Sequence, residues 1–187
     1  MDKEETCIIL DFLASGYSDR RHAEPTAQAI GTNSFSLLEL VPREGIELKQ
    51  GDEVYVGEGK RDKIRFIRGT LEYGRLTNVA KNELEITIEE VIRKKETRFV
   101  DFFNKSGMLT PRMHSIQLLP GVGKKHLVDL LDERKKKPFE SFAEIIQRVK
   151  NFPDPFKIVV QRVITELESE EKYHLFTKPK PVRRERY

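Results

Sequence analysis

The segment Leu118–Lys125 reads LLPGVGKK and combines residue types that suit an anionic ligand. Its two glycines permit positive φ and let the main chain approach a ligand closely. The turn opens a predicted helix, whose first N–H groups lack intrahelical partners and point outward with the positive end of the helix dipole. Two lysines add positive charge beside them. The turn therefore predicts a phosphate-binding site formed by Gly121, Val122, Gly123, Lys124 and Lys125.

The same turn has a simpler interpretation as a tight helix–helix connector with solvated lysines. The paired lysines favour phosphate contact over that interpretation. The motifs of common enzyme classes are absent: the sequence has no Walker A loop, no Gly-x-Ser-x-Gly and no His-Glu-x-x-His. We therefore expect a binding protein and not an enzyme.

Helices are expected to position this turn. One helix is predicted to run from Thr110 to Leu119, with Thr110 as N-cap and Pro111 at its first position. Another follows the turn, with leucines on one face. Two more begin at capping signals, Ser141 with Glu144 and Asp154 with Pro155. Together these helices predict a compact all-α domain over residues 109–176, followed by a basic tail over residues 177–187.

The N-terminal part has the sequence pattern of a β-domain. Short apolar runs separated by glycine turns predict five strands, at Thr6–Leu13, Thr26–Ile30, Ser34–Val41, Val54–Val56 and from Ile64 toward Tyr73. This pattern predicts a small barrel of the OB type over residues 1–75. Helical spacing then begins at Leu76 and predicts a bridge over residues 76–108. Its apolar face contains Leu84, Ile88, Val91, Ile92, Phe99, Phe102 and Phe103, and the phenylalanines are expected to be core.

The predicted barrel contains a second group of candidate nucleic-acid ligands, in which basic residues alternate with aromatic ones. Cations that follow phosphates and rings that stack on bases are what single-strand binding requires. Strand alternation places Lys63 and Arg65 on one face and Phe66 and Arg68 on the other, so Phe66 fits the core as well as a stacking platform. The full group is Lys63, Arg65, Phe66, Arg68, Tyr73 and Arg75.

Composition restricts the class of protein further. The chain has no apolar run long enough to span a membrane, and its acidic start, MDKEET, is unlike an export signal. The single Cys7 fits a reducing compartment, which predicts a cytoplasmic protein. The net charge is +3, and the excess of basic residues lies after Leu118. This asymmetry favours an anionic partner.

The segment Ser115–Val149 resembles a helix-hairpin-helix domain, which binds the DNA backbone without sequence preference. The resemblance rests on the LPGVGKK hairpin, on Arg134 near the end of the next helix, and on the Pro-Phe-x-Ser-Phe run that begins at Pro138. It implies DNA or RNA as partner and adds Arg134 to the candidate site. It also allows a monovalent cation at the hairpin, and no other cofactor is expected. The whole chain resembles an archaeal family of unknown function, with an OB-like domain before the hairpin.

Two rival functions follow from similar resemblances. The hairpin is similar to that of endonuclease III-like glycosylases, where a lysine at the position of Lys125 attacks the sugar. This chain lacks the downstream aspartate context of that class, and one cysteine cannot bind its iron–sulfur cluster. Paired helical hairpins also dock proteins, which makes an interaction adaptor the main alternative. The sequence leaves open DNA or RNA, single or double strand, and the oligomeric state.

Overall fold

The computed structural model describes residues 3–17 and 24–179. The chain divides into two compact units. The first comprises Met1–Thr87 and Glu166–Tyr187, and the second comprises Ile88–Thr165. Most of the predicted basic tail, from residue 180 on, lies outside the described residues. Over the described ranges, no helix combines the length and apolar composition that a membrane span requires.

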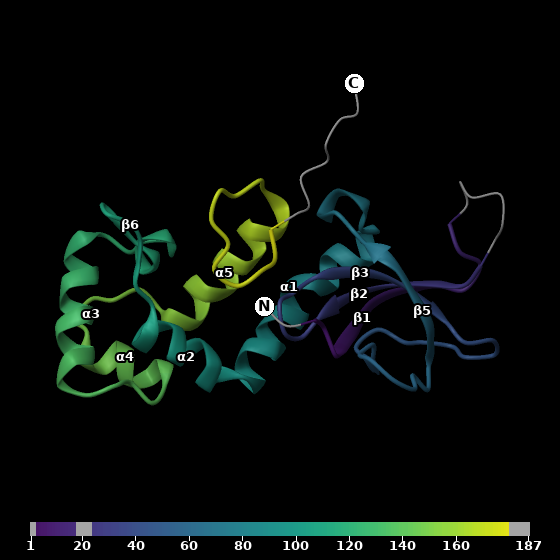
Figure 1. Cartoon of the computed structure of the whole chain (residues 1–187), viewed down its shortest axis with the longest axis horizontal. Helices are drawn as coiled ribbons and strands as arrows, with labels where there is room; N and C mark the ends of the chain where they lie inside the picture. Colours follow the sequence, from purple (N-terminus) through teal and green to yellow (C-terminus); the bar gives the residue numbers. More distant parts are fainter. Residues whose placement is uncertain (1–2, 18–23, 180–187) are drawn as a thin grey trace, which may run out of the picture. The chain divides into compact units, whose positions relative to one another are not determined.

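The first unit is built on one five-stranded antiparallel sheet, curled into a half-barrel (Figure 1). Its strands are β1 (Thr6–Leu13), β2 (Thr26–Gly31), β3 (Leu37–Pro42), β4 (Glu53–Tyr55) and β5 (Ile64–Thr70). Their spatial order is β4-β1-β2-β3-β5, so β4 and β5 form the two edges. The sequence predicted all five strands.

Strand β3 begins later than predicted because the residues before it bind a buried carboxylate. Glu4 is 8% exposed and accepts hydrogen bonds from the backbone N–H groups of Asn33, Ser34 and Ser36. These N–H groups are therefore directed to Glu4 and not into the strand ladder. Gly31 faces the same side chain, and a Cβ there would overlap the Glu4 carboxyl.

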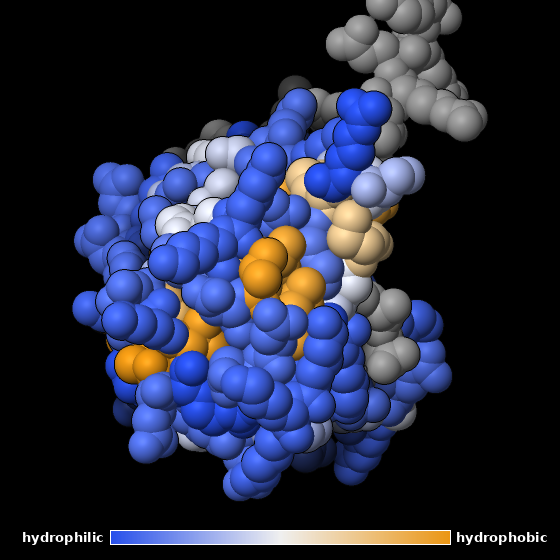
Figure 2. Space-filling model, turned by 90° about the vertical axis from the view of Figure 1, so that its left-hand side faces the viewer, coloured by the Kyte–Doolittle hydropathy of each residue, from blue (hydrophilic) through white to orange (hydrophobic). Residues whose placement is uncertain are grey.

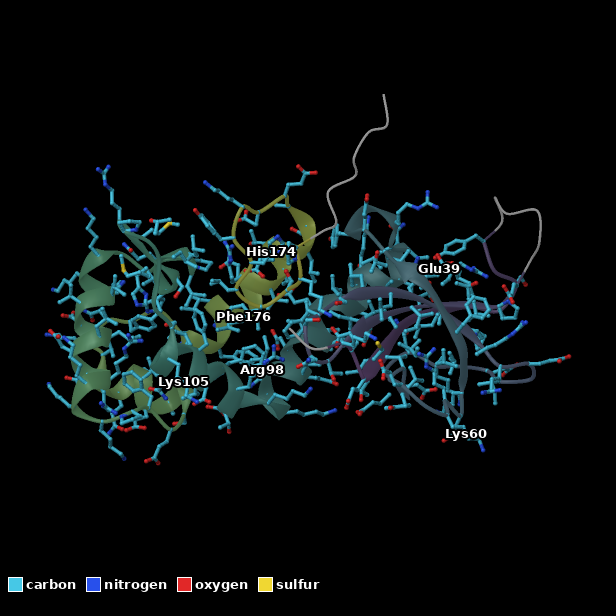
Figure 3. The ribbon with its side chains drawn as sticks, viewed as in Figure 1. Glu39, Lys60, Arg98, Lys105, His174 and Phe176 are labelled. Carbon is cyan, nitrogen blue, oxygen red and sulfur yellow. The ribbon has the colours of Figure 1, made fainter. Side chains whose placement is uncertain are left out.

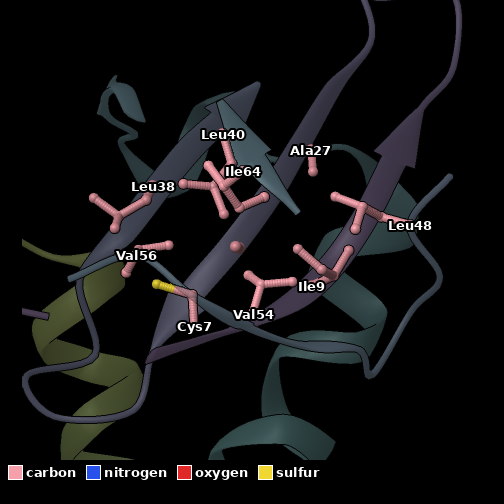
Figure 4. Close-up of a cluster of buried hydrophobic side chains, with 10 residues drawn as sticks. Cys7, Ile9, Ala27, Leu38, Leu40, Leu48, Val54, Val56 and Ile64 are labelled. Atoms are coloured by element: carbon pink, nitrogen blue, oxygen red, sulfur yellow. The ribbon is translucent and has the colours of Figure 1, made fainter. Parts of the chain in front are cut away.

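The core of the half-barrel is a cluster of small and branched side chains (Figure 4). Every residue of β2 and β3 is buried, so the sheet is covered on both faces and does not show the alternation of a half-exposed strand. Cys7 lies in this core, and burial, followed by the Glu4 charge, raises the pKa of its thiol. The cluster consists of Cys7, Ile9, Ala27, Ala29, Leu38, Leu40, Leu48, Val54, Val56 and Ile64.

Two further segments complete the first unit. The short 3-10 helix η1 (Tyr73–Arg75) follows β5. The chain after α5 folds back onto Glu166, whose carboxylate accepts hydrogen bonds from the N–H groups of Leu175, Phe176 and Thr177. Figure 3 shows His174 and Phe176 on this segment.

The second unit is mainly helical. Its elements are α1 (Asn78–Lys94), α2 (Glu96–Lys105), β6 (Met108–Thr110), β7 (Met113–His114), the 3-10 helix η2 (Ser115–Leu118), α3 (Lys124–Lys136), α4 (Phe142–Arg148) and α5 (Pro155–Glu168). Helices α1 and α5 each continue across the boundary between the units.

The predicted helix from Thr110 to Leu119 is wrong. A short hairpin, β6–β7, and one 3-10 turn occupy this segment. The carbonyl of Gly107 accepts hydrogen bonds from both the N–H and the hydroxyl of Ser115, which closes the hairpin. His114 and Gln117 then form a capping box that starts η2. The capping interactions thus begin at His114 and not at Thr110.

Two predicted helix starts and most of the predicted helical core are confirmed, but Phe102 is only half-buried. Phe99 and Phe103 are buried, and the Phe103 ring meets the rings of Phe142 and Phe152 edge-on at 6.3 and 6.1 Å between centroids. The Ser141 hydroxyl accepts from the Glu144 N–H at 3.1 Å and caps α4. At the start of α5, Asp154 accepts from the N–H of Phe156 at 3.0 Å.

Candidate anion-binding turn

The turn before α3 has the backbone geometry that its glycines allow. Gly121 adopts a φ of +75°, in the left-handed region, and Val122 N–H donates to Leu119 O at 3.2 Å. Gly123 is the N-cap of α3, and no side chain caps this helix end. The hydrogen bond from Leu127 N–H to Gly123 O, at 3.0 Å, runs from α3 back into the turn. The N–H groups at the start of α3 therefore lack intrahelical acceptors.

The charge at this end of α3 is positive. Lys124 and Lys125 are exposed, and the first turn of the helix contains no acidic residue. Within the described residues, neither lysine has a salt-bridge partner. Lys135 and Lys136, at the other end of the same helix, are instead paired with Asp132 and Glu133.

Two contacts hold the turn in place. Val122 is 8% exposed and anchors the turn in the unit's interior. The His126 Nδ1–H donates to Gly121 O at 3.1 Å, and the His126 ring packs edge-on against Phe152. This hydrogen bond uses one of the two acceptor sites of the Gly121 carbonyl oxygen.

A groove of about 500 Å³ lies beside the turn. Most of its charged groups neutralise one another: Arg148 and Lys136 both pair with Glu133, whose pKa is lowered chiefly by the hydrogen bond from Lys136. Lys125 and Lys150 are the groove cations that have no ion-pair partner within the described residues. The groove is lined by Lys125, His126, Asp129, Asp132, Glu133, Lys136, Arg148, Lys150 and Asn151.

Lys150 and Asn151 belong to a second turn that the sequence analysis did not assign to the site. A Cβ placed on Gly121 would lie 3.8 Å from Pro153, so the two turns are neighbours. Asn151 has a φ of +58°, which asparagine tolerates better than most residues. A local signal, the Asn-Phe-Pro run, marks the turn. Its position beside Gly121 depends on tertiary contacts that no local pattern shows.

The Arg134 side chain binds backbone carbonyls at the end of α2. Its Nη1 donates to the carbonyl oxygens of Phe103 and Ser106, each at 2.9 Å. Burial lowers the pKa of its guanidinium. Arg134 thus ties the end of α2 to α3, and we do not include it among the residues proposed to bind a ligand.

The basic candidates on β5, and Lys63 just before it, are paired with acids. Arg68 contacts Glu24 and Glu39, and Arg65 contacts Glu24 at 3.4 Å. Lys63 lies 3.9 Å from Asp52. Figure 3 shows Glu39 on the sheet. These pairs leave less free positive charge on β5 than the sequence indicates.

Three candidates remain: Phe66 lies on β5, and Tyr73 and Arg75 lie beyond its end. Irregular register between β3 and β5 brings both Ile64 and Ile67 to the core cluster, which breaks simple alternation and leaves Phe66 opposite Val41. Tyr73 and Arg75 lie on η1, where the Tyr73 hydroxyl bonds Glu168, and this bond raises the pKa of the phenol. The basic and aromatic residues therefore do not form one continuous strand face.

Together, the fold and the turn define a mixed α and β protein whose described residues form a curled antiparallel sheet and five α-helices. It presents a lysine-flanked helix start that has no side-chain cap. The chain belongs to the family described as "Protein of unknown function (DUF655)", whose model matches residues 3–178.

Relatives of this chain come from archaea. It is 38% identical over 177 residues to an uncharacterized protein of Methanocaldococcus jannaschii, a match that covers 94% of this chain and 80% of that protein. It is also similar to a crystal structure of a protein from Archaeoglobus fulgidus, whose title gives the same family. That comparison has a TM-score of 0.83 and 44% identity, and it covers 94% of this chain and 100% of the other.

Proposed function

We propose that this protein is a non-enzymatic nucleic-acid-binding protein that contacts the phosphate backbone through the turn Gly121–Lys125. In this proposal Ser115–Val149 acts as a helix-hairpin-helix module. The half-barrel serves as an OB-like domain that adds a second contact. Backbone contacts position a protein without reading sequence, so little sequence preference is expected.

One observation carries the proposal. Backbone N–H groups without intrahelical acceptors and two lysines occur together at the start of α3, whose first turn contains no acidic residue. Neither lysine has a salt-bridge partner among the residues that the structure describes. Oriented N–H groups and the helix dipole favour an anion, and each lysine adds a full positive charge. Lys150, across the groove from the same turn, supplies a further unpaired cation.

The test is fluorescence anisotropy with labelled single-stranded DNA, duplex DNA and RNA at several salt concentrations. The Lys124→Ala/Lys125→Ala double variant should bind more weakly to each ligand that the wild type binds. Its log–log salt slope on duplex DNA should fall by about 0.9 for each lost phosphate contact.

A matched control lies on the same helix. The Lys135→Ala/Lys136→Ala double variant removes the same charge, but from lysines already paired with Asp132 and Glu133. It should change the salt slope much less than the variant at the turn. Equal effects of both variants would assign binding to net charge and overturn the assignment of the turn.

The interaction adaptor is the second candidate, favoured by exposed apolar side chains on the helices. Val128 of α3 is 55% exposed and Ile146 of α4 is 50% exposed. An adaptor would retain its partner after loss of Lys124 and Lys125 and would lose it after Val128→Ser or Ile146→Ser. Phosphate binding at the turn gives the unpaired lysines a role, whereas the adaptor function gives them none.

A further inference from the structure

The proposed phosphate site lies in a stretch of sequence without acidic residues, although Asp129, Asp132 and Glu133 of α3 line the groove beside it. No Asp or Glu occurs from Phe102 to Val128, although the 187 residues of the chain include 31 acidic ones. This segment contains four basic residues, Lys105, Arg112, Lys124 and Lys125, of which Lys105 is paired with Asp101 at 2.6 Å. It forms the end of α2, the β6–β7 hairpin, η2, the turn and the start of α3.

The β6–β7 hairpin presents apolar side chains to solvent within this positive segment. Met108 is 59% exposed and Leu109 is 38% exposed, and Arg112 at the tip is exposed as well. Figure 2 shows this end of the molecule, where apolar side chains emerge among hydrophilic ones. Exposed apolar side chains contribute little to the core, and these two are accessible to an apolar group of a ligand.

The hairpin is fixed at its base. Ser115 binds Gly107 O with both its N–H and its hydroxyl, at 3.0 and 2.9 Å. Arg134 binds the carbonyl of Ser106, just before the hairpin. Strand β7 leads directly into η2, which packs against α3. The exposed apolar residues of β6 and the proposed phosphate-binding turn are therefore parts of one anchored structure.

We infer that the β6–β7 hairpin is an apolar wedge for unpaired nucleobases, in a nucleic acid whose phosphates bind at Gly121–Lys125. The inference rests on the proposed function and names its ligand class: single-stranded or locally unpaired nucleic acid. The absence of acidic residues from this stretch suits a polyanion, and the exposed Met108 and Leu109 are of the types that insert as apolar wedges between bases.

A blunt duplex is a poorer ligand for this surface. Its base faces are stacked inside the helix, and an apolar side chain reaches them only by unstacking a base step. A single strand, or a duplex with a bulge, offers unstacked bases beside a continuous phosphate backbone. The wedge therefore predicts a preference for these ligands over a blunt duplex of the same sequence.

The test compares wild type, Met108→Ala/Leu109→Ala and Lys124→Ala/Lys125→Ala on single-stranded, bulged and blunt duplex DNA. The hairpin variant should lose about tenfold in affinity for single-stranded and bulged DNA, with its salt slope and its affinity for blunt duplex unchanged. The lysine variant should weaken all three and lower the slope. Ile146→Ala, which truncates an equally exposed side chain on α4, should bind like the wild type.

A 2-aminopurine base in the strand reports contact directly. Its fluorescence should change on binding of the wild type and much less on binding of the hairpin variant. Circular dichroism should confirm that this variant folds, because both side chains are exposed. If the hairpin variant binds every ligand like the wild type, or weakens all three equally, the wedge is overturned and the proposed function stands. If the wild type binds no nucleic acid at low salt, both fail.

Discussion

At the scale of single residues, His114 links the hairpin to the helix that follows. It is 4% exposed, and its Nδ1 accepts a hydrogen bond from Ile116 N–H at 3.2 Å. A ring nitrogen that accepts cannot carry a proton, so this bond requires the neutral ring. Burial, assisted by the charge of Arg134, lowers the pKa of His114 below its ordinary value of 6.5.

This environment predicts a loss of stability in mild acid. The pKa of His114 is lower in the folded protein than in the unfolded chain. Between the folded-state pKa and 6.5, the imidazole is therefore protonated to a greater extent in the unfolded chain. The contribution of neutral His114 is therefore fully present above the unfolded pKa and decreases as the pH falls through this window. Urea unfolding of the wild type at pH 7.5, 6.5 and 5.5 should show a decreasing free energy of unfolding.

The His114→Asn variant is the control, since asparagine retains a side-chain acceptor but does not titrate. The variant should lose less stability than the wild type between pH 7.5 and 5.5. Parallel pH profiles for the two proteins would show that His114 does not cause the change.

Residue-scale features also limited what the sequence could predict. The sequence correctly indicated the caps Ser141 and Asp154, because a cap depends on residues within one turn of the chain. It indicated Arg134 as a ligand, although this side chain binds the carbonyls of Phe103 and Ser106, which come from an earlier helix end. A basic residue near a helix end looks the same in a sequence whether it faces solvent or neighbouring backbone.

At the scale of elements, the turn before α3 depends on one glycine more than on the other. Gly121 has a φ of +75°, whereas Gly123 has a φ of −88° and ψ of 179°, a conformation open to any residue. No atom lies within 4 Å of a Cβ placed on Gly123, and a Cβ on Gly121 meets Pro153 only at ordinary contact distance. The difference between the two positions is therefore conformational.

Alanine substitutions should separate these two glycines. Gly121→Ala should destabilise the protein by about 1–2 kcal/mol, the cost of the left-handed conformation for a residue with a Cβ. Gly123→Ala should destabilise the protein less, because its extended conformation suits alanine and the remaining cost is that alanine is a poorer N-cap than glycine. Chemical denaturation of both variants tests this expectation, and equal destabilisation would contradict it.

Elements with local signals were predictable, and elements closed by distant contacts were not. The five strands follow from apolar runs between glycine turns, and α1 follows from the spacing of Leu84, Ile88 and Val91. The β6–β7 hairpin was missed because Thr110-Pro111 resembles a helix start. The contact that closes the hairpin joins Gly107 and Ser115, which lie on either side of these two residues, and no local pattern shows it. The turn itself was predicted, but its neighbour Lys150 reaches the groove only through tertiary packing.

At the scale of the whole molecule, the two compact units share helices. The boundary falls within α1, after Thr87, and within α5, after Thr165. Helices shorter than about 12–15 residues are marginal without packing partners. If one unit unfolded, the segments of α1 and α5 that belong to it would lose their packing partners. The remaining segments of the two helices would then be shorter and less stable. We therefore expect the units to unfold together.

The distribution of tyrosine allows a direct measurement. The chain has five Tyr and no Trp, and none of the tyrosines lies in the second unit, Ile88–Thr165. Tyrosine fluorescence therefore reports on the first unit, while circular dichroism at the helix minimum is dominated by helices that lie mainly in the second. In one urea titration, the two signals should give the same midpoint and slope, the signature of a single cooperative transition. Separate midpoints would show that the shared helices break at the boundary, and that each unit is stabilised by its own core alone.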